Sequence, residues 1–240
     1  MEKIITIENL RNFAYCNNNI CKKPIKGIAI SFFGLGVDKM YFEDTAEGYR
    51  FGDDGILYVV PYQNPWCWQN EQNVAYTDEI LDVLFKEYDL PEDLPIVSEG
   101  GSMGGLLALD YMIYSKRRPV ACVANCPVCD LPYHYTERAD LPRTLYSAFY
   151  HYSGTLQDAM KTASPIDLVD KMPTDAKYYI YHCEADEAVN KQKHSDRFVE
   201  KLAKDHEVVY VTVPERGHCD LPDEVRETYF AYMKKAILER

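Results

Sequence analysis

Short runs of apolar residues alternate with longer amphipathic stretches along most of the chain. The apolar runs are nearly continuous and lack the polar alternation of a half-exposed strand. Such runs are typical of strands covered on both faces of a sheet. We therefore predict strands at residues 27–32, 56–60, 95–99, 120–125, 178–183 and 208–213.

The stretches between these runs have helical spacing. The clearest is one apolar stripe of a helix that faces a sheet, with Thr77 or Asp78 as its candidate N-cap, made by Ile80, Leu81, Leu84, Phe85 and Tyr88. Further helices are predicted at residues 104–114, 191–203 and 223–238. This alternation predicts the α/β class, with a mostly parallel central sheet and helices on both faces.

One stretch breaks the alternation. Residues 131–171 lie between two predicted strands, exceed the length of a simple crossover and are rich in aromatic residues. A long insertion of this kind usually covers a site, so we expect a helical lid, with added core helices as the alternative. Because no repeat or Gly/Ser linker marks a boundary, we expect a single domain over residues 1–240.

Composition narrows the possible partners. Of the 240 residues, 47% are hydrophobic and 27% charged, as in globular proteins, and 38 acidic against 26 basic residues give a net charge of −12. This balance argues against nucleic acid as a partner. No apolar run reaches the roughly 18 residues of a membrane span, and the first residues do not resemble an export signal. We therefore expect a cytoplasmic protein without a membrane role; the sequence carries no signal for an oligomeric state.

The eight cysteines mostly lie within apolar stretches, which predicts reduced, buried thiols. Cys126 and Cys129 have the spacing of metal ligands. However, no second Cys or His pair lies at a matching distance, and Pro127 stands between them. We therefore expect neither a zinc site nor any other metal or cofactor.

A glycine-rich motif follows the third predicted strand and directly precedes a predicted helix. It reads Gly100-Gly101-Ser102-Met103-Gly104-Gly105, which contains Gly-x-Ser-x-Gly. In a nucleophile elbow, the turn from strand to helix is so tight that its neighbours must be small, and it exposes the central hydroxyl. Ser102 is therefore the candidate nucleophile, and a glycine turn that only packs helix on strand is the alternative.

A serine hydroxyl needs a base, which is usually a histidine oriented by a carboxylate. His218 follows the last predicted strand, at the carboxyl edge where active sites of open α/β sheets lie. Asp186 follows the preceding strand at the same edge, and Glu184 is the alternative to it. The chain order Ser102, Asp186, His218 is itself typical of one serine hydrolase architecture.

The oxyanion of such a reaction needs two backbone N–H donors. The residue after the nucleophile, Met103, supplies one. The second is expected in the glycine-containing loop after the first predicted strand, where Leu35 is the first choice and Gly34 or Phe33 are alternatives.

These motifs together resemble the α/β-hydrolases, and within them the catalytic domain of the prolyl oligopeptidase-like serine hydrolases. The resemblance extends from Gly27 to nearly the end of the chain. It is carried by the glycine-rich motif, by Ala163-Ser-Pro-Ile-Asp-Leu168, by His182-Cys-Glu-Ala-Asp-Glu-Ala-Val189 and by Gly217-His218. Two positions depart from the family pattern: Cys183 replaces a glycine, and Phe33 stands where many relatives have a histidine.

The resemblance implies hydrolysis of an ester or amide through an acyl-enzyme. Aromatic residues of two segments are expected at the mouth of the pocket, and the candidate substrate-binding residues are Phe33, Trp66, Trp68 and Tyr150. The leading hypothesis is an esterase for a small soluble ester, such as an acylated sugar. The alternatives are a peptidase for short peptides and a non-catalytic binding protein on the same fold.

Overall fold

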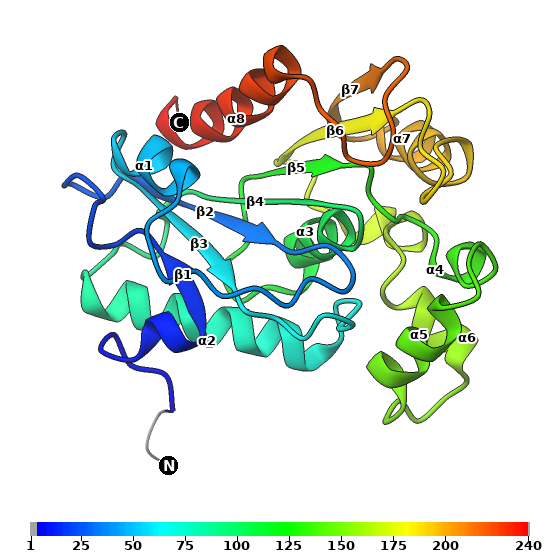
Figure 1. Ribbon diagram of the computed structural model, residues 1–240, viewed down its shortest axis with the longest axis horizontal. Coiled ribbons are helices and arrows are strands. Elements are labelled where there is room, and N and C mark those ends of the chain that lie inside the picture. Colours follow the sequence, from blue (N-terminus) through cyan, green and yellow to red (C-terminus); the bar gives the residue numbers. More distant parts are fainter. Residues whose placement is uncertain (1–3, 240) are drawn as a thin grey trace.

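The computed structural model describes residues 4–239. Its central feature is a seven-stranded sheet with the strand order β1-β3-β2-β4-β5-β6-β7 (Figure 1). The strands are β1 (Ala14–Cys16), β2 (Gly27–Phe32), β3 (Ile56–Pro61), β4 (Ile96–Gly101), β5 (Ala121–Asn125), β6 (Lys177–Cys183) and β7 (Glu207–Val213). From β2 to β7 all neighbours are parallel, so the expected α/β class and its mostly parallel sheet are confirmed.

The six expected strands correspond to β2 to β7, and their bounds differ by at most one or two residues. The sequence prediction missed β1, an antiparallel edge strand in which Tyr15 pairs with Val60. Three residues are too few to show a periodic pattern.

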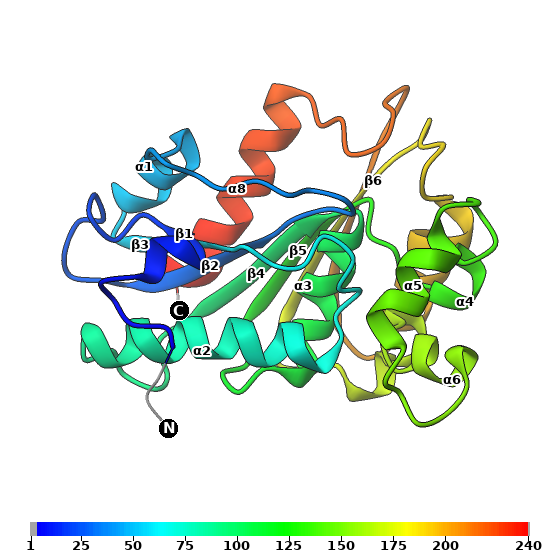
Figure 2. The same cartoon turned by 60° about the horizontal axis from the view of Figure 1, so that its bottom comes forward.

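Helices cover both faces of the sheet, as Figure 2 shows. One face carries α2 (Glu71–Glu87), α3 (Met103–Tyr114) and α7 (Arg197–Leu202), whose apolar side chains form the larger core. The other face carries α1 (Ala46–Gly52) and α8 (Asp223–Leu238), which form a second core. Within residues 4–239, no helix has both the length and the apolar character needed to cross a membrane.

The start of α2 differs from the expectation. The helix begins at Glu71, where the Asn70 side chain accepts a hydrogen bond from the Asn73 N–H, and not at Thr77 or Asp78. The first three residues of the helix, Glu71, Gln72 and Asn73, are polar, so the apolar stripe marks only a later part of the helix. Asp78 instead accepts a hydrogen bond of 2.6 Å from the Tyr111 hydroxyl. The stretch expected as a helix at 191–203 also divides, into a π-helical segment (Gln192–Asp196) and α7.

Residues 131–171 form short helices between β5 and β6, on one side of the molecule in both ribbon views (Figures 1 and 2). They comprise α4 (Leu131–His134), α5 (Leu141–Phe149), α6 (Leu156–Lys161) and two 3-10 turns, Pro165–Asp167 and Val169–Lys171. Local capping explains where two of them begin: Asp130 accepts from the Tyr133 N–H, and Thr155 forms a capping box with Asp158.

Candidate active site

Ser102 occupies a strained turn between β4 and α3. Its backbone angles are φ 60° and ψ −125°, a region that non-glycine residues rarely adopt, at a cost of about 1–3 kcal/mol. The turn is possible because its glycines let backbones meet: a Cβ on Gly100 would lie 2.4 Å from the Gly104 carbonyl, and a Cβ on Gly104 would lie 2.2 Å from the Phe32 carbonyl oxygen. The expected strand, turn and helix around Ser102 are therefore present.

Backbone hydrogen bonds hold this turn in place. The Ser102 N–H donates to the Asn125 carbonyl at 2.9 Å, which ties the turn to the end of β5. The Ser102 carbonyl accepts from the N–H groups of Gly105, Leu106 and Val128, at 3.1, 3.2 and 3.3 Å. With both backbone groups engaged, the hydroxyl is the part of Ser102 that is free for chemistry.

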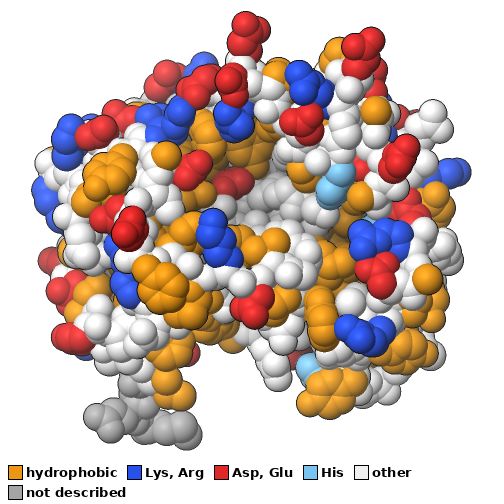
Figure 3. Space-filling view, in the orientation of Figure 1, with side chains coloured by type: hydrophobic (Ala, Val, Ile, Leu, Met, Phe, Trp, Pro, Cys, Tyr) orange, Lys and Arg blue, Asp and Glu red, His pale blue; other side chains and the backbone are white. Residues whose placement is uncertain are grey.

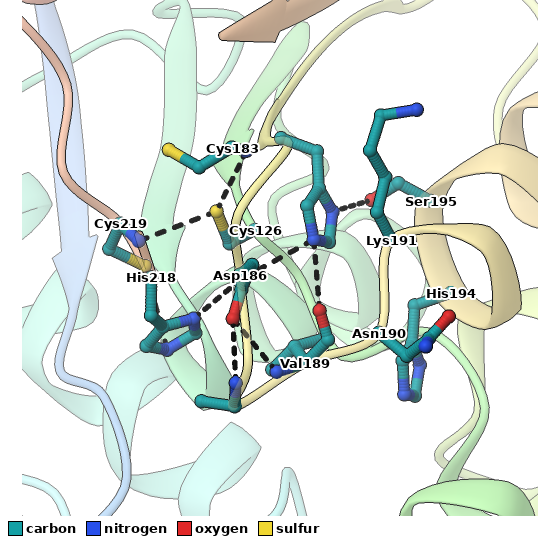
Figure 4. A network of polar contacts seen from close by, with 12 residues as sticks. Cys126, Cys183, Asp186, Val189, Asn190, Lys191, His194, Ser195, His218 and Cys219 are labelled. Carbon is teal, nitrogen blue, oxygen red and sulfur yellow. Dashed lines mark hydrogen bonds and ion pairs between the residues drawn. The ribbon is translucent and has the colours of Figure 1, made fainter. Parts of the chain in front are cut away.

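Asp186 and His218 come together from the loops after β6 and β7. The His218 Nδ1 lies 2.7 Å from Asp186 Oδ2, while Asp186 Oδ1 accepts from the N–H groups of Ala188 and Val189 at 2.8 and 2.9 Å (Figure 4). The side chain of Asp186 is fully buried, and His182 Nε2 also lies 3.4 Å from its Oδ2. These contacts fix the carboxylate and, through it, the orientation of the imidazole.

The same contacts shift the pKa of both groups. Burial opposes the charged form of Asp186, but hydrogen bonds from His182, His218 and the Val189 amide outweigh it and hold the pKa of the carboxyl far below its usual range. Burial also lowers the pKa of His218, yet the Asp186 carboxylate, with a smaller contribution from Cys126, raises it to about 9. The pair is thus arranged to stabilise an imidazolium.

Ser102 and His218 line one cavity of about 880 Å³ at the carboxyl edge of the sheet. Phe33 and Trp66, two of the expected substrate-binding residues, also line it. Figure 3 shows this face of the molecule hollowed, with hydrophobic and basic side chains and a histidine at the edge of the hollow. The cavity is wide enough for a small organic molecule.

Donors for an oxyanion are available beside Ser102. Met103 is the first residue of α3, and the first N–H groups of a helix have no partner within it. Gly34 packs against the turn that contains Ser102, since a Cβ there would lie 3.8 Å from the Ser102 Cβ, and Leu35 lines the cavity. The next amide, that of Gly36, is engaged with the Pro65 carbonyl at 2.9 Å.

Three residues that the sequence analysis considered for this site do not line the cavity that contains Ser102. They are Trp68, Tyr150 and Glu184. Trp68 has no exposed surface, and its indole N–H donates to Thr144 Oγ1 at 3.0 Å, so the prediction that it contacts substrate is wrong. Tyr150 is 80% exposed and lines a different cavity, with Trp66 and His151. Glu184 is exposed, and it is the Asp186 carboxylate that contacts His218.

Sequence reasoning missed a set of charged residues on the insertion. Arg138, Asp140 and Arg143 line the cavity that contains Ser102. Arg138 and Asp140 form an ion pair at 2.6 Å, and the Arg143 guanidinium lies over the Trp66 ring, 4.8 Å from its centroid. In the sequence these charged residues are typical of a solvent-exposed loop. Only their position within residues 131–171, which are expected to cover the site, indicates that they could line the cavity.

A cluster of potential metal ligands joins residues 131–171 to the main body. Glu137 Oε2 contacts His134 Nδ1 at 2.5 Å and His194 Nε2 at 2.8 Å. His194 Nδ1 accepts two backbone N–H groups, from Cys129 and Asp130, so its proton lies on Nε2 and is donated to Glu137. A metal at Nε2 would require the imidazolate, and we therefore interpret this cluster as a structural hydrogen-bond network.

The parallel sheet, its order and the strained serine turn define the class of protein: it has the α/β-hydrolase fold. Residues 79–236 match the model of the prolyl oligopeptidase family. The chain belongs to this family, which confirms the resemblance seen in the sequence and indicates a hydrolase. No curated protein is similar enough in sequence to be matched.

Solved structures share the fold at low sequence identity. An acylaminoacyl peptidase in complex with Z-Gly-Gly-Phe-chloromethyl ketone superposes with a TM-score of 0.68 at 16% identity, over 91% of this chain and 38% of that one. The Pyrococcus horikoshii acylaminoacyl peptidase gives 0.67 at 14% identity, over 89% and 37%. Thermogutta terrifontis esterase 2 gives 0.63 at 17% identity, over 94% and 86%. This chain therefore spans well under half the length of the peptidases but most of the esterase.

Proposed function

We propose that this protein is a serine hydrolase that cleaves a small ester through an acyl-enzyme. One observation carries the proposal: His218, hydrogen-bonded to Asp186 at 2.7 Å, lines the same cavity as Ser102, which sits in a strained strand-to-helix turn. A histidine held in this way by a carboxylate activates a serine hydroxyl when it accepts the proton of that hydroxyl. Family membership supports it.

In the proposed reaction, Ser102 Oγ attacks the ester carbonyl while His218 Nε2 takes its proton. Asp186 holds the imidazole by Nδ1 and stabilises the imidazolium that forms. The Met103 amide, and one amide of the 34–35 loop with Leu35 as first choice, bind the oxyanion. The imidazolium then protonates the departing alcohol, and water releases the acyl group by the same route in reverse.

The lining of the cavity favours a polar substrate with one flat or apolar face. Trp66 and Phe33 offer aromatic surface, while Arg143 and Asp140 supply a hydrogen-bond donor and an acceptor from the insertion. An acylated sugar matches this combination of aromatic and charged side chains. A sugar ring stacks on an aromatic face, and its hydroxyl groups form hydrogen bonds with charged groups. In this proposal residues 131–171 act as a lid, and the protein acts in the cytoplasm without a cofactor.

A short-peptide peptidase is the second candidate, and the similarity in fold to acylaminoacyl peptidases favours it. The two candidates differ in the leaving group. Matched acetyl-leucine substrates, one an ester and one an anilide, separate them by kcat/KM. Turnover of the ester alone supports the esterase, and efficient turnover of the anilide supports the peptidase.

Labelling with a fluorophosphonate, read by intact mass, tests the proposal. We expect one adduct on the native protein and none on Ser102→Ala, which should keep the fold and lose hydrolysis by several orders of magnitude. Circular dichroism of both proteins is the control for folding. Unchanged turnover in Ser102→Ala contradicts the assignment of Ser102 as the nucleophile. A folded, metal-free native protein without an adduct contradicts the proposal and favours a binding protein on this fold.

A further inference from the structure

Two cysteine thiols lie beside the candidate base. Cys219 Sγ is 3.7 Å from His218 Nε2, and the ligand atoms of Cys126, His218 and Cys219 all lie within 4.8 Å of one another. They come from two places in the chain, the end of β5 and the loop after β7 (Figure 4). The proposed reaction uses the histidine and leaves both thiols unexplained.

The backbone at both cysteines is unusual. Cys126 has φ 45° and Cys219 has φ 57°, values that few residues other than glycine adopt. Cys219 also packs closely on the nucleophile strand, because a Cβ on Gly101 would lie 3.0 Å from its Sγ. In these backbone conformations the sulfur atoms of both cysteines lie beside the imidazole of His218.

Two backbone hydrogen bonds hold the sulfur of Cys126 in place. Its Sγ accepts from the backbone N–H groups of Cys183 and Cys219, each at 3.4 Å (Figure 4). The neighbouring Cys219 thiol and burial raise the pKa of Cys126, which is therefore a thiol until a metal displaces its proton; the two N–H donors would then stabilise the thiolate. They also fix the position of that sulfur before any metal arrives.

His218 is oriented in the way that metal-binding histidines are. Its Nδ1 is held by the Asp186 carboxylate at 2.7 Å, which leaves Nε2 as the nitrogen that faces the thiols. A carboxylate behind the ring is the usual outer-shell partner of a histidine ligand, since it fixes the tautomer and raises the basicity of the other nitrogen.

The separation between Cys219 and His218 suits a tetrahedral site. Bonds of about 2.3 Å to sulfur and about 2.0 Å to nitrogen place the two ligand atoms about 3.5 Å apart at the tetrahedral angle. The separation of 3.7 Å between Cys219 Sγ and His218 Nε2 requires almost no adjustment. Cys129, whose spacing from Cys126 suggested a zinc pair, instead directs its Sγ to the Pro127 carbonyl at 3.5 Å.

Access to this cluster is through Cys219. All eight cysteines lie in the described part of the chain, and Cys219 alone among them is partly exposed. It lines the cavity that contains Ser102, so a fourth coordination position would open toward that cavity. Three protein ligands and one open position are the arrangement of accessible zinc sites.

We propose that Cys126, Cys219 and His218 bind a soft divalent cation of the Zn²⁺ class and that this cation switches off the hydrolase. On binding, each thiol loses its proton to solvent and the metal takes the lone pair of His218 Nε2. That lone pair is then no longer available to accept the proton of Ser102. The loss of activity rests on the proposed function, whereas the binding itself does not.

Cobalt titration of the metal-free native protein tests the binding, since Co²⁺ bound by thiolates gives a charge-transfer band in the near ultraviolet. We expect this band in the native protein, its loss in Cys126→Ala and in Cys219→Ala, and its retention in Cys183→Ala. Cys183 is the matched control, because it is a buried neighbour whose Sγ bonds to the Asp220 carbonyl. Absence of the band in the native protein, or its retention in either of the first two variants, overturns the site.

Inhibition is measured on the same proteins. Zn²⁺ should abolish fluorophosphonate labelling of the native protein and of Cys183→Ala, EDTA should restore it, and the other two variants should label equally with and without Zn²⁺. Where a variant misfolds, alkylation of Cys219 in the native protein replaces it and should abolish the cobalt band. Metal-free protein that is never labelled contradicts the proposed function alone, because the cobalt spectrum still reports on the site.

Discussion

At the scale of single residues, the relation between Asp186 and His218 decides how the site responds to pH. A base must be neutral to accept the Ser102 proton, and the Asp186 carboxylate raises the pKa of His218 to about 9. We therefore expect kcat/KM for a neutral ester to rise as the pH increases from the ordinary pKa of histidine to about 9. Assays in EDTA buffer measure this profile, and a plateau already reached at pH 7 would contradict it.

The carboxylate itself is tested by a pair of substitutions. Asp186→Asn keeps an oxygen to accept the Ala188 and Val189 amides but no longer stabilises the imidazolium, so we expect kcat to fall by about 10³- to 10⁴-fold. Glu184→Gln, two residues away and exposed, should leave kcat unchanged. The opposite result would assign the role to Glu184.

At the scale of elements, the turn between β4 and α3 depends on the absence of side chains where the strand and helix meet. In Gly104→Ala the new Cβ would lie 2.2 Å from the Phe32 carbonyl oxygen, and backbone must move to admit it. We expect a loss of unfolding free energy of about 2 kcal/mol or more, together with loss of the fluorophosphonate adduct.

Urea denaturation measures this change, with Gly217→Ala as the control because a Cβ there would meet no atom within 4 Å. The control should stay within about 0.5 kcal/mol of the native protein. A fully stable and labelled Gly104→Ala protein would show that the turn does not need the close approach.

At the scale of the whole molecule, Glu137 connects the insertion to the main body through His134 and His194. Burial raises the pKa of Glu137, but the hydrogen bonds with the two histidines outweigh it and lower this pKa to about 2. The carboxylate therefore stabilises the fold at pH values above its ordinary pKa. This stabilisation is lost as the pH falls toward 2. Glu137→Gln should cost about 2 kcal/mol at pH 7 and little at pH 2. Urea denaturation at several pH values measures the difference, and Glu187→Gln, on an exposed loop, is the control.

Much of this molecule could be predicted from its sequence. The strands of the sheet are buried on both faces, so their apolar runs could be recognised in the sequence. The glycine-rich turn indicated Ser102, and the carboxyl edge of a parallel sheet indicated Asp186 and His218. The burial of Trp68, the cavity-lining charges of Arg138 and Arg143, and the meeting of Cys126 with Cys219 could not be predicted. Each of these depends on packing between segments far apart in the chain, which leaves no periodic signal.

The position of residues 131–171 between β5 and β6 has a consequence for how such proteins diverge. The insertion leaves the sheet at its carboxyl edge and returns to it without interrupting any strand, and it contributes Arg138, Asp140 and Arg143 to the cavity. Its length and composition can therefore change during evolution while the strand-borne groups stay in register. Under the proposed function, selectivity and reactivity are carried by separate parts of the chain, so one can be exchanged, by selection or by grafting, without rebuilding the other.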